Sequence, residues 1–543
     1  MRKRLFTLFL MGLIFYVRFA FLITVMAEER TAGGFYEPLR VVGAKIENNR
    51  FLPIIIPSEN EIFSEEKRIF GLLFHIRKDI RDPHPFIKLK IVEKEFPFLY
   101  LPYTGVLPAI YIPKIYMKIF GTSLYSLRSG ILVIFLLFLF VYTGFVQKLD
   151  RENYLLISIY LITFPIFGLI FATPFFANAP MIFIALIIIL SQIKKVLKNS
   201  FIGSREAFLI FLGCGCILHF HLLAGGAIIF SLIFSFFLTE RRISLKAKPG
   251  SVIAGAFIFI LLVFPYIMTS PEEIKRLIFR GKHSVYEILL LPLYSTLYHL
   301  IGLFAGPSFT EIFLHDRIDI RYIPFSILSG IIMSFGFVGL FTQEKGKFKN
   351  FLLFMCLFYL FITLFGDIRP YHINYVFPFI VPFIQDGLKR IRILSEKSIK
   401  YILTIGIFLN IIQIEMLRES IKNSSLSLSL HKEVADYLTK NRIKKIHNIA
   451  GMYDYVFISK ERIEVIDFIP FIGYNHPRDR IYLSLLLSKG EVILLESYKR
   501  AGITTGVSLE EVMDIAKETG LRIRVLKKFP DKGKYELVLA RVE

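Results

Sequence analysis

The chain has 543 residues, of which 54% are hydrophobic and only 20% charged, with a mean hydropathy of +0.57 and a formal net charge of +22. A soluble domain needs more charge to cover its surface, so this balance excludes an ordinary soluble protein. The basic excess does not indicate a nucleic-acid partner, because much of it lies in short loops between apolar runs. The sequence therefore predicts a polytopic α-helical membrane protein.

The first apolar run, residues 5–26, predicts a retained transmembrane helix. It is too long for the apolar part of a signal peptide and lacks a small-residue cleavage site. Arg18 lies inside this run, where a charged side chain needs a partner. Together with later runs of similar length, it gives about 11 transmembrane helices. The predicted spans, accurate to a few residues, are 5–26, 127–146, 154–171, 175–193, 207–221, 223–239, 251–269, 322–341, 350–366, 371–387 and 400–418.

The loops between the spans alternate in charge. The basic loops are 147–152, 192–206, 240–248, 343–349 and 387–400, and the loops 172–180, 219–226 and 366–374 contain only Arg369 among their basic residues. Because Lys and Arg favour the cytoplasmic side, we expect a cytoplasmic N-terminus and an external first loop and C-terminus. The run 286–306 is long enough to span, but spanning would place 343–349 outside. We interpret it as a helix that dips into the outer leaflet or lies against it; the alternative is a true span paired with one that the pattern misses.

Two large segments are expected outside the membrane. Residues 1–420 form the transmembrane domain, whose first external loop, 27–104, mixes apolar and charged residues and predicts amphipathic helices on the membrane surface. Residues 430–543 predict a soluble α/β domain with a mainly parallel sheet, because helical and strand patterns alternate. The expected helices are 431–441, 478–490 and 508–520, and the expected strands are 444–451, 491–497, 521–529 and 535–542. Neither a G-x-G-x-x-G motif nor a P-loop marks this segment as nucleotide-binding.

Polar residues gather where the chain leaves the membrane on the outer side, and any chemistry is expected there. The carboxylates of the first external loop include Glu28, Glu29, Glu37, Glu47, Asp79 and Asp82. The short outer turns add Asn178, His219, His221, Asp367, Arg369, Tyr371 and His372. The three cysteines, Cys214, Cys216 and Cys356, lie in apolar runs and are interpreted as small apolar filler. No motif requires a metal or another cofactor, and a divalent metal stays open.

Each of these residues has a structural alternative. Arg369, Tyr371 and His372 suit a lipid-linked phosphate, or they anchor a helix end among the headgroups. His219 and His221, two residues apart, do not favour one metal on a helix and fit polar residues at a helix break.

The turn around Asp82 and His84 is rich in proline and fits a structural role. Glu37 fits a general base whose pKa is raised by partial burial, and equally a first-turn acid of a helix over 39–46. The residues alone leave these two readings of Glu37 even.

Several stretches occur in an order that resembles the GT-C superfamily of membrane glycosyltransferases, the bacterial relatives of protein O-mannosyltransferases and aminoarabinose transferases. An outer acid precedes "LRVVGAKI", and "IFGTS" with Leu127 and Arg128 matches an element that leads into the second span. Arg369, Tyr371 and, with a small offset, Pro378 match an element that opens a late span. The stretch "GMYDYVFISKERIEVID" is similar to the appended outer domain of some bacterial members.

The resemblance implies a catalytic base in the first outer loop. By its spacing to "VVGAKI" the base falls on Glu37, with Glu28, Glu29 and Asp82 as alternatives. The family's Asp-Glu pair would place its Asp at Tyr36, and its His-Pro-Pro-Leu element at "GVLP"; both are absent, and Asn178 stands where the family often has Asp.

The implied reaction is an inverting transfer of a hexose or pentose from a polyprenyl-phosphate donor to a lipid, glycan or protein acceptor outside. Arg369, Tyr371 and His372 would bind the donor phosphate. The rival interpretations are a transporter or flippase for a lipid-linked substrate, and a scaffold that keeps the fold without the chemistry.

Overall fold

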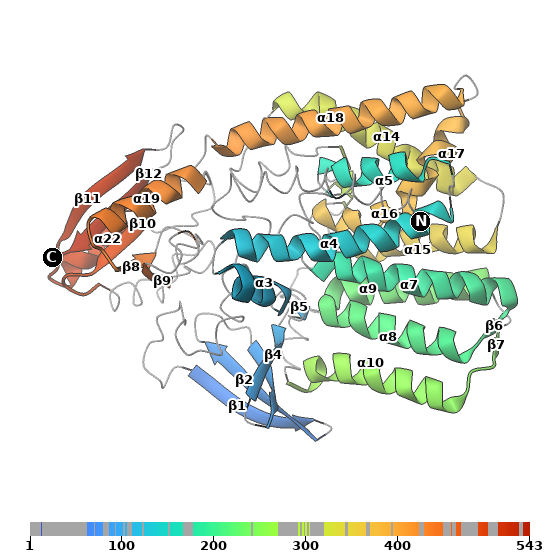
Figure 1. Ribbon diagram of the computed structural model, residues 1–543, viewed down its shortest axis with the longest axis horizontal. Coiled ribbons are helices and arrows are strands. Elements are labelled where there is room, and N and C mark those ends of the chain that lie inside the picture. The colour runs from blue at the N-terminus through green and yellow to red at the C-terminus, as the bar shows by residue number, and fades with distance from the viewer. Residues whose placement is uncertain are drawn as a thin grey trace.

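The computed structural model places a bundle of long helices at one end of its long axis and a five-stranded C-terminal sheet at the other, with a second sheet between them (Figure 1). It describes Gly12 and residues 62–69, 71–79, 86–92, 94–100, 104–105, 111–121, 124–149, 152–165, 167, 178–240, 243–269, 292–293, 296–297, 299–300, 303–304, 320–342, 346–364, 370–391, 395–422, 428–448, 458, 463–467, 487–497, 509–530 and 536–543. Both sheets lie toward the helix ends that the charge pattern predicts to be external.

Nine helices of the bundle fall on predicted spans, usually within a few residues. They are α4 (Leu124–Gln147), α5 (Tyr154–Thr163), α7 (Asn178–Asn199), α8 (Ser204–Phe220), α9 (Leu222–Thr239), α10 (Pro249–Thr269), α14 (Ile323–Thr342), α15 (Lys347–Thr363) and α18 (Glu396–Lys422). Helix α5 is shorter than the predicted 154–171, because Phe164 has an extended conformation (φ −58°, ψ 117°) before Pro165. The span 5–26 lies outside the described residues except for Gly12, which is helical.

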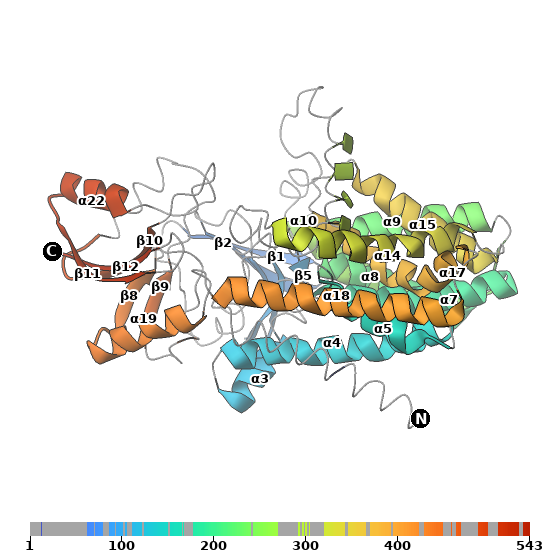
Figure 2. The ribbon, with the colours of Figure 1, turned by 90° about the horizontal axis from the view of Figure 1, so that it is seen from above.

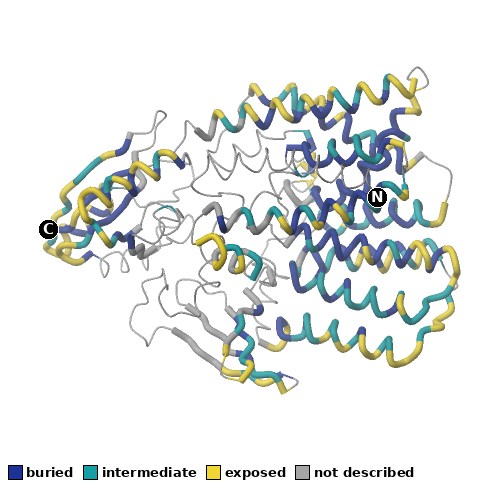
Figure 3. The backbone as a smooth tube through the Cα atoms, in the orientation of Figure 1, coloured by how far each residue is buried: buried dark blue, intermediate teal, exposed yellow. Residues whose placement is uncertain are grey.

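The surface of the bundle is apolar, as a bilayer requires. By length and composition, four described helical stretches can cross a membrane: Ala179–Asn199, Pro249–Met268, Ile323–Phe341 and Glu396–Met416. Large apolar side chains such as Phe257 of α10, Phe237 of α9 and Phe408 of α18 are exposed. Figure 3 shows α7 largely buried, with α10 and α18 exposed at the edges. Exposed apolar belts of this extent are unfavourable in water, so the chain is a polytopic membrane protein.

The predicted span 371–387 is not one continuous helix. It is a series of short pieces: η6 (Pro370–Tyr375), α16 (Phe377–Ile380), η7 (Val381–Phe383) and α17 (Ile384–Lys389). Pro378 and Pro382 lack backbone donors and crowd the preceding turn, which explains why a regular α-helix is not maintained. The segment is nonetheless buried, with Phe377 and Ile384 fully inaccessible.

Glycines allow α14 to approach this broken helix backbone to backbone. A Cβ atom on Gly336 would lie 2.6 Å from the carbonyl oxygen of Ile380. A Cβ atom on Gly339 would run into the carbonyl oxygen of Phe383 and lie 2.7 Å from the amide nitrogen of Gly387. We call the three glycines, Gly336, Gly339 and Gly387, the glycine seam. In lipid, the hydrophobic effect does not drive helices together. Small residues at such crossings therefore stabilise the bundle by allowing close packing.

A polar network joins three helices inside the bundle. Asn410 of α18 accepts a hydrogen bond from Ser329 Oγ of α14 (2.5 Å), and its Nδ2 lies 3.5 Å from Thr163 Oγ1 of α5. Tyr160 of α5 donates to the Ser329 carbonyl oxygen at 2.7 Å. All four side chains are buried. Uncharged polar groups whose hydrogen bonds are made can be buried between helices at little cost.

The loop 27–104, which the charge pattern predicts to be external, contains a sheet, so the prediction of amphipathic helices is wrong for its described part. An antiparallel meander runs through β1 (Ile62–Ile69), β2 (Leu72–Asp79), β3 (Phe86–Ile91), β4 (Lys94–Tyr100) and β5 (Thr104–Gly105). The sequence of β3 alternates apolar and basic residues with a period of two, as in a strand with one covered face. The two-residue turn after β1 has Gly71 at φ 79°, and the turn after β3 has Val92 at φ 57°.

One face of this sheet packs against the bundle. Phe74, Ile87 and Phe98 form a buried cluster with Tyr266 near the end of α10. The sheet is thereby held at one end of the bundle, where α8 and α10 approach it. A short helix, α3 (Ile112–Phe120), connects it to α4 and leaves Ile119 and Phe120 exposed, at 66% and 65%.

The C-terminal sheet is mixed rather than mainly parallel. Its order is β11-β12-β10-β8-β9, built from β8 (Lys445–Asn448), β9 (Glu464–Asp467), β10 (Val492–Ser497), β11 (Ile523–Pro530) and β12 (Glu536–Val542). The pairs β10–β8 and β8–β9 are parallel, whereas β12 is antiparallel to both neighbours. A short connection joins β11 to β12, and short connections produce antiparallel hairpins. Sequence reasoning also missed β9, and most of its predicted helix 478–490 lies outside the described residues.

Two helices cover opposite faces of this sheet: α19 (Leu428–Lys440) on one and α22 (Leu509–Glu518) on the other (Figure 2). Successive side chains of β10 point to opposite faces of the sheet: Leu494 belongs to the hydrophobic cluster that contains α19, and Ile493 to the one that contains α22. At the edge, β11 has an irregular register between Val525 and Lys527.

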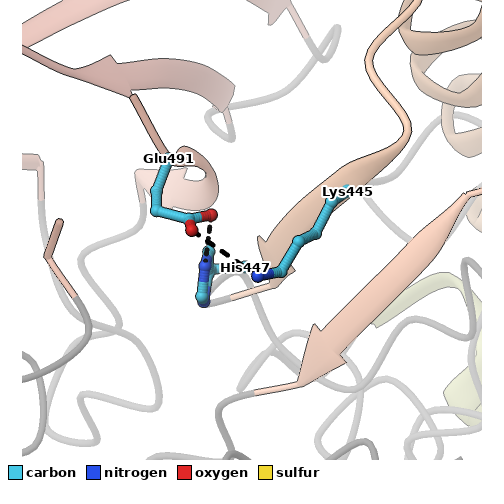
Figure 4. A network of polar contacts seen from close by, with 3 residues as sticks. All are labelled: Lys445, His447 and Glu491. Carbon is cyan, nitrogen blue, oxygen red and sulfur yellow. Dashed lines mark hydrogen bonds and ion pairs between the residues drawn. The ribbon is translucent and has the colours of Figure 1, made fainter. Parts of the chain in front are cut away.

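An ionic cluster ties β8 to the start of β10 (Figure 4). His447 Nε2 lies 2.8 Å from a carboxylate oxygen of Glu491, and Lys445 Nζ lies 3.5 Å from the other. Partial burial alone would raise the pKa of Glu491. The hydrogen bond and charge of His447, together with Lys445, outweigh it, and the pKa of Glu491 is lowered.

Candidate functional site

The connection between α8 and α9 is a single residue, His221. Its backbone is extended (φ −160°, ψ 103°), and its Nδ1 accepts a hydrogen bond from the amide of Ala224 at 3.2 Å. Since an imidazole nitrogen accepts only when it carries no proton, the ring proton is on Nε2. His221 therefore caps the N-terminus of α9, which is the role of a polar residue at a helix break.

His219 is buried beneath this connection and has a packing role. Its Nδ1 lies 3.3 Å from the carbonyl oxygen of Leu262 and donates to it, while Tyr266 donates to the His219 carbonyl oxygen at 2.8 Å. The ring of Phe98 meets it edge-on, with 5.0 Å between centroids. His219 thus joins α8, α10 and the first sheet. Among the described residues, no group of three His, Cys, Asp or Glu side chains is placed to hold a metal.

The late outer element lies beside the start of α7. Tyr371 and His372 belong to η6, and in the same turn structure Tyr375 packs against Phe183 of α7, with ring centroids 5.5 Å apart. Asn178 is the first residue of α7, so the structure places it and η6 at the same end of the bundle. Tyr375 also contacts Tyr359 of α15, with 6.0 Å between centroids. Two of the sequence elements singled out as candidates therefore lie close to each other.

The candidate catalytic bases lie outside the described residues. They are Glu28, Glu29, Glu37 and Asp82, and the phosphate-binding candidate Arg369 is outside as well. Their roles stay predictions from the sequence. The matched element "IFG" has a local explanation, because α3 ends at Phe120 and Gly121 follows it with φ 78°, which glycine adopts without strain.

Sequence reasoning missed two buried polar side chains at this end. His299 lies in the run 286–306, and its Nε2 is 3.1 Å from Thr363 Oγ1 at the end of α15. Asn374 lies in η6, 3% exposed, and neither atom of its amide has a hydrogen-bond partner in the part of the chain that the structure describes. The His in an apolar run was a signal that could have been used; the state of Asn374 depends on tertiary contacts and is not visible in the sequence.

The segment of His299 runs across the bundle. Its described pieces between 292 and 304 are helical, and the carbonyl oxygen of Leu303 faces Gly330 of α14 so closely that a Cβ atom there would lie 2.5 Å from it. In Figure 2 these short pieces succeed one another across the direction of α10 and α18. Whether 286–306 spans the membrane or lies against the outer leaflet stays a prediction.

No protein-family model matches the chain, and no curated protein matches it. Solved structures do. The apo crystal structure of ArnT from Cupriavidus metallidurans aligns with 81% of this chain and 88% of its own, at 11% identity and a TM-score of 0.50. The structure of the same protein bound to undecaprenyl phosphate aligns with 98% of this chain and 97% of its own, at 9% identity and a TM-score of 0.54.

The fold is that of ArnT. This fold is the one that the sequence resemblance to GT-C membrane glycosyltransferases, with the aminoarabinose transferases among them, led us to expect. The alignment with the lipid-bound form of ArnT extends over nearly the whole of both chains. At 9% and 11% identity, the likeness establishes the architecture and leaves the chemistry to the residues.

Proposed function

We propose that the protein is an inverting glycosyltransferase that moves a sugar from a polyprenyl-phosphate donor to an acceptor on the outer side of the cytoplasmic membrane. The observation that carries the proposal is the likeness in fold to ArnT over nearly the whole chain. The ArnT structure in this comparison was solved bound to undecaprenyl phosphate. The clustering of η6, the start of α7 and the first sheet at one end of the bundle supports a single site there.

In the proposed reaction, Glu37 takes the proton from the acceptor hydroxyl, and the hydroxyl oxygen attacks the anomeric carbon from the side opposite the phosphate. The bond between the anomeric carbon and the phosphate oxygen breaks, and polyprenyl phosphate leaves with the bonding electron pair. Arg369, Tyr371 and His372 would stabilise the charge that develops on the phosphate. The transfer needs no cofactor in this scheme, with a divalent metal as the alternative.

The topology completes the proposal. The N-terminus is cytoplasmic, and residues 430–543 form a domain outside the membrane that covers the site or presents the acceptor, which is a lipid, a glycan or a protein. A transporter or flippase is the rival. Transporter folds usually consist of repeated halves with broken helices about a central site, and the sequence contains no internal repeat.

Reconstituted membranes with a pool of polyprenyl-phosphate sugars and an acceptor extract would test the proposal. The release of free polyprenyl phosphate is followed by mass spectrometry for wild type, Glu37→Gln and Glu47→Gln, the last as a matched carboxylate of the same loop. We expect release by wild type and Glu47→Gln and at least a hundred-fold slower release by Glu37→Gln. Release by all three keeps the enzyme and moves the base to Glu28, Glu29 or Asp82.

A flippase predicts a different outcome in the same vesicles. The sugar-bearing lipid would change leaflets intact, without release of polyprenyl phosphate and without sensitivity to Glu37→Gln. Movement of the intact lipid, with no release across a broad set of acceptors, would overturn the transferase proposal. Chelation with EDTA during turnover decides between the cofactor-free scheme, which tolerates it, and a metal-dependent one.

A further inference from the structure

Asn374 is a buried amide whose hydrogen-bonding groups are unused. Its side chain is 3% exposed, and neither Nδ2 nor Oδ1 has a partner in the described residues. Asn410, the comparable buried amide of α18, bonds through both atoms. Because buried polar groups in folded proteins nearly always have partners, an amide with two unused atoms at one end of a bundle indicates a ligand group that is not part of the chain.

The position of Asn374 connects it to the candidate site. In a 3₁₀-helix residues three apart lie on the same face, so position 374 of η6 shares a face with position 371. The neighbouring Tyr375 contacts Phe183 of α7 and Tyr359 of α15. These contacts fix the end of η6 against α7 and α15, and Asn374 belongs to this element, which also contains the predicted phosphate-binding residues Tyr371 and His372.

His299, in the run 286–306, supplies a second unused group, and it contacts the end of helix α15. The hydroxyl of Thr363 donates its single proton to the Leu360 carbonyl oxygen at 2.8 Å, the shorter of its contacts, so it accepts from His299 Nε2 at 3.1 Å. The proton of the neutral ring is then on Nε2, and Nδ1 is left as an acceptor. His299 is 8% exposed, and its Nδ1 has no partner in the described part of the chain. Thr363 lies one turn after Tyr359, which contacts Tyr375 beside Asn374, so one stretch of α15 connects the segments that carry the two unused groups.

The chemistry of these groups selects a class of ligand. An ionised phosphate offers only acceptors, and a polyprenyl chain offers no hydrogen-bonding group, so neither can satisfy the acceptors Asn374 Oδ1 and His299 Nδ1. A hydroxyl group both donates and accepts. We propose that Asn374, together with His299, binds hydroxyl groups of the sugar on the polyprenyl-phosphate donor and so determines which sugar is accepted; this rests on the proposed function.

Two leucine variants separate binding from folding. Asn374→Leu removes an amide that has no partner, so we expect the unfolding transition to stay where it is or rise, because an unsatisfied buried amide destabilises. Asn410→Leu, the matched control, removes two hydrogen bonds that the structure contains and should lower the midpoint of the unfolding transition. The affinities for undecaprenyl phosphate and for undecaprenyl phosphate carrying glucose, mannose or 4-aminoarabinose are measured by native mass spectrometry of the full chain.

We expect wild type to prefer at least one sugar-bearing lipid over undecaprenyl phosphate, and Asn374→Leu to bind that lipid about ten-fold more weakly, as the loss of one or two hydrogen bonds predicts. Its affinity for undecaprenyl phosphate should be unchanged. His299→Leu should act in the same direction. Equal weakening for both lipids would assign Asn374 to the phosphate and overturn the proposal.

Two further results would also overturn it. One is an unchanged affinity of Asn374→Leu for every lipid; the other is a wild type that gains nothing from any of the sugars. In the second case, binding of undecaprenyl phosphate by wild type would still support a lipid-phosphate site, whereas the absence of all binding would count against the proposed function as well.

Discussion

The glycine seam allows a quantitative prediction about folding. In Gly339→Ala, the new methyl carbon would run into the carbonyl oxygen of Phe383, and would lie 2.7 Å from the amide nitrogen of Gly387 and 2.9 Å from the Phe383 carbonyl carbon. Ordinary contacts of a Cβ atom begin at 3.4 Å. The atoms in the way belong to the backbone and cannot rotate aside, so α14 and the broken helix must separate by roughly 1 Å along their contact. Overpacking of this kind costs about 1–3 kcal/mol, and we expect the upper end because the obstacle is rigid.

The assay is reversible unfolding in mixed micelles by titration with SDS, followed by circular dichroism. Gly144→Ala in α4 is the control, because a Cβ atom there meets nothing within 4 Å. It should leave stability unchanged or raise it by up to about 1 kcal/mol, as alanine favours helix over glycine. If Gly339→Ala and Gly144→Ala unfold at the same SDS fraction, the close approach in the seam is not real and the reasoning fails.

Three further changes have defined outcomes. Val92→Gly should stabilise the first sheet by about 1 kcal/mol in the same titration, because a β-branched residue at φ 57° is strained; a loss of stability would contradict this. Because the pKa of Glu491 is lowered, its contacts stabilise the fold at pH values above the ordinary carboxyl pKa of 4.5, and this contribution is lost as the pH falls through the lowered pKa. In Glu491→Gln, the free energy of unfolding should therefore depend less on pH in that acid range. The chain has no tryptophan, so a single introduced tryptophan is the only source of indole fluorescence. Brominated lipids should quench the fluorescence of Ile119→Trp, on the exposed face of α3, and should not quench that of Met513→Trp on α22. Equal quenching of both variants would show that α3 does not lie on lipid.

Long apolar runs were enough to predict most of the bundle, because a helix is the only way for a single segment to satisfy its backbone in lipid. The broken helix was missed although Pro378 and Pro382 are visible in the sequence, since the centre of the run is apolar. In the loop 27–104, charged residues obscured the period of two that β3 shows clearly. Mean hydropathy does not distinguish an apolar pattern with a period of 2 from one with a period of 3.6 residues. The period is what separates a strand from a surface helix.

The candidate site was predictable to a smaller extent. The location at the outer end follows from charge alternation, and Asn178, Tyr371 and His372 lie on elements that meet there. Of the two histidines, His221 forms the break between α8 and α9 and His219 lies in the last turn of α8; their hydrogen-bond partners, the Ala224 amide and the Leu262 carbonyl, fit the structural alternative. Asn374 could not have been selected from the sequence, because only the structure shows that its amide is buried without a hydrogen-bond partner among the described residues.

The irregular register of β11 has a consequence for how copies of the protein meet. Membrane proteins diffuse in two dimensions with a fixed orientation, so like surfaces collide edge to edge far more often than in solution. Among the described strands, β11 forms one of the two edges of the C-terminal sheet, and it carries Arg524, Lys527 and Lys528 beside its irregular register. An edge strand with an irregular register and charged side chains is a poor template for pairing with an identical strand. We therefore expect that crowded copies do not join their sheets along β11.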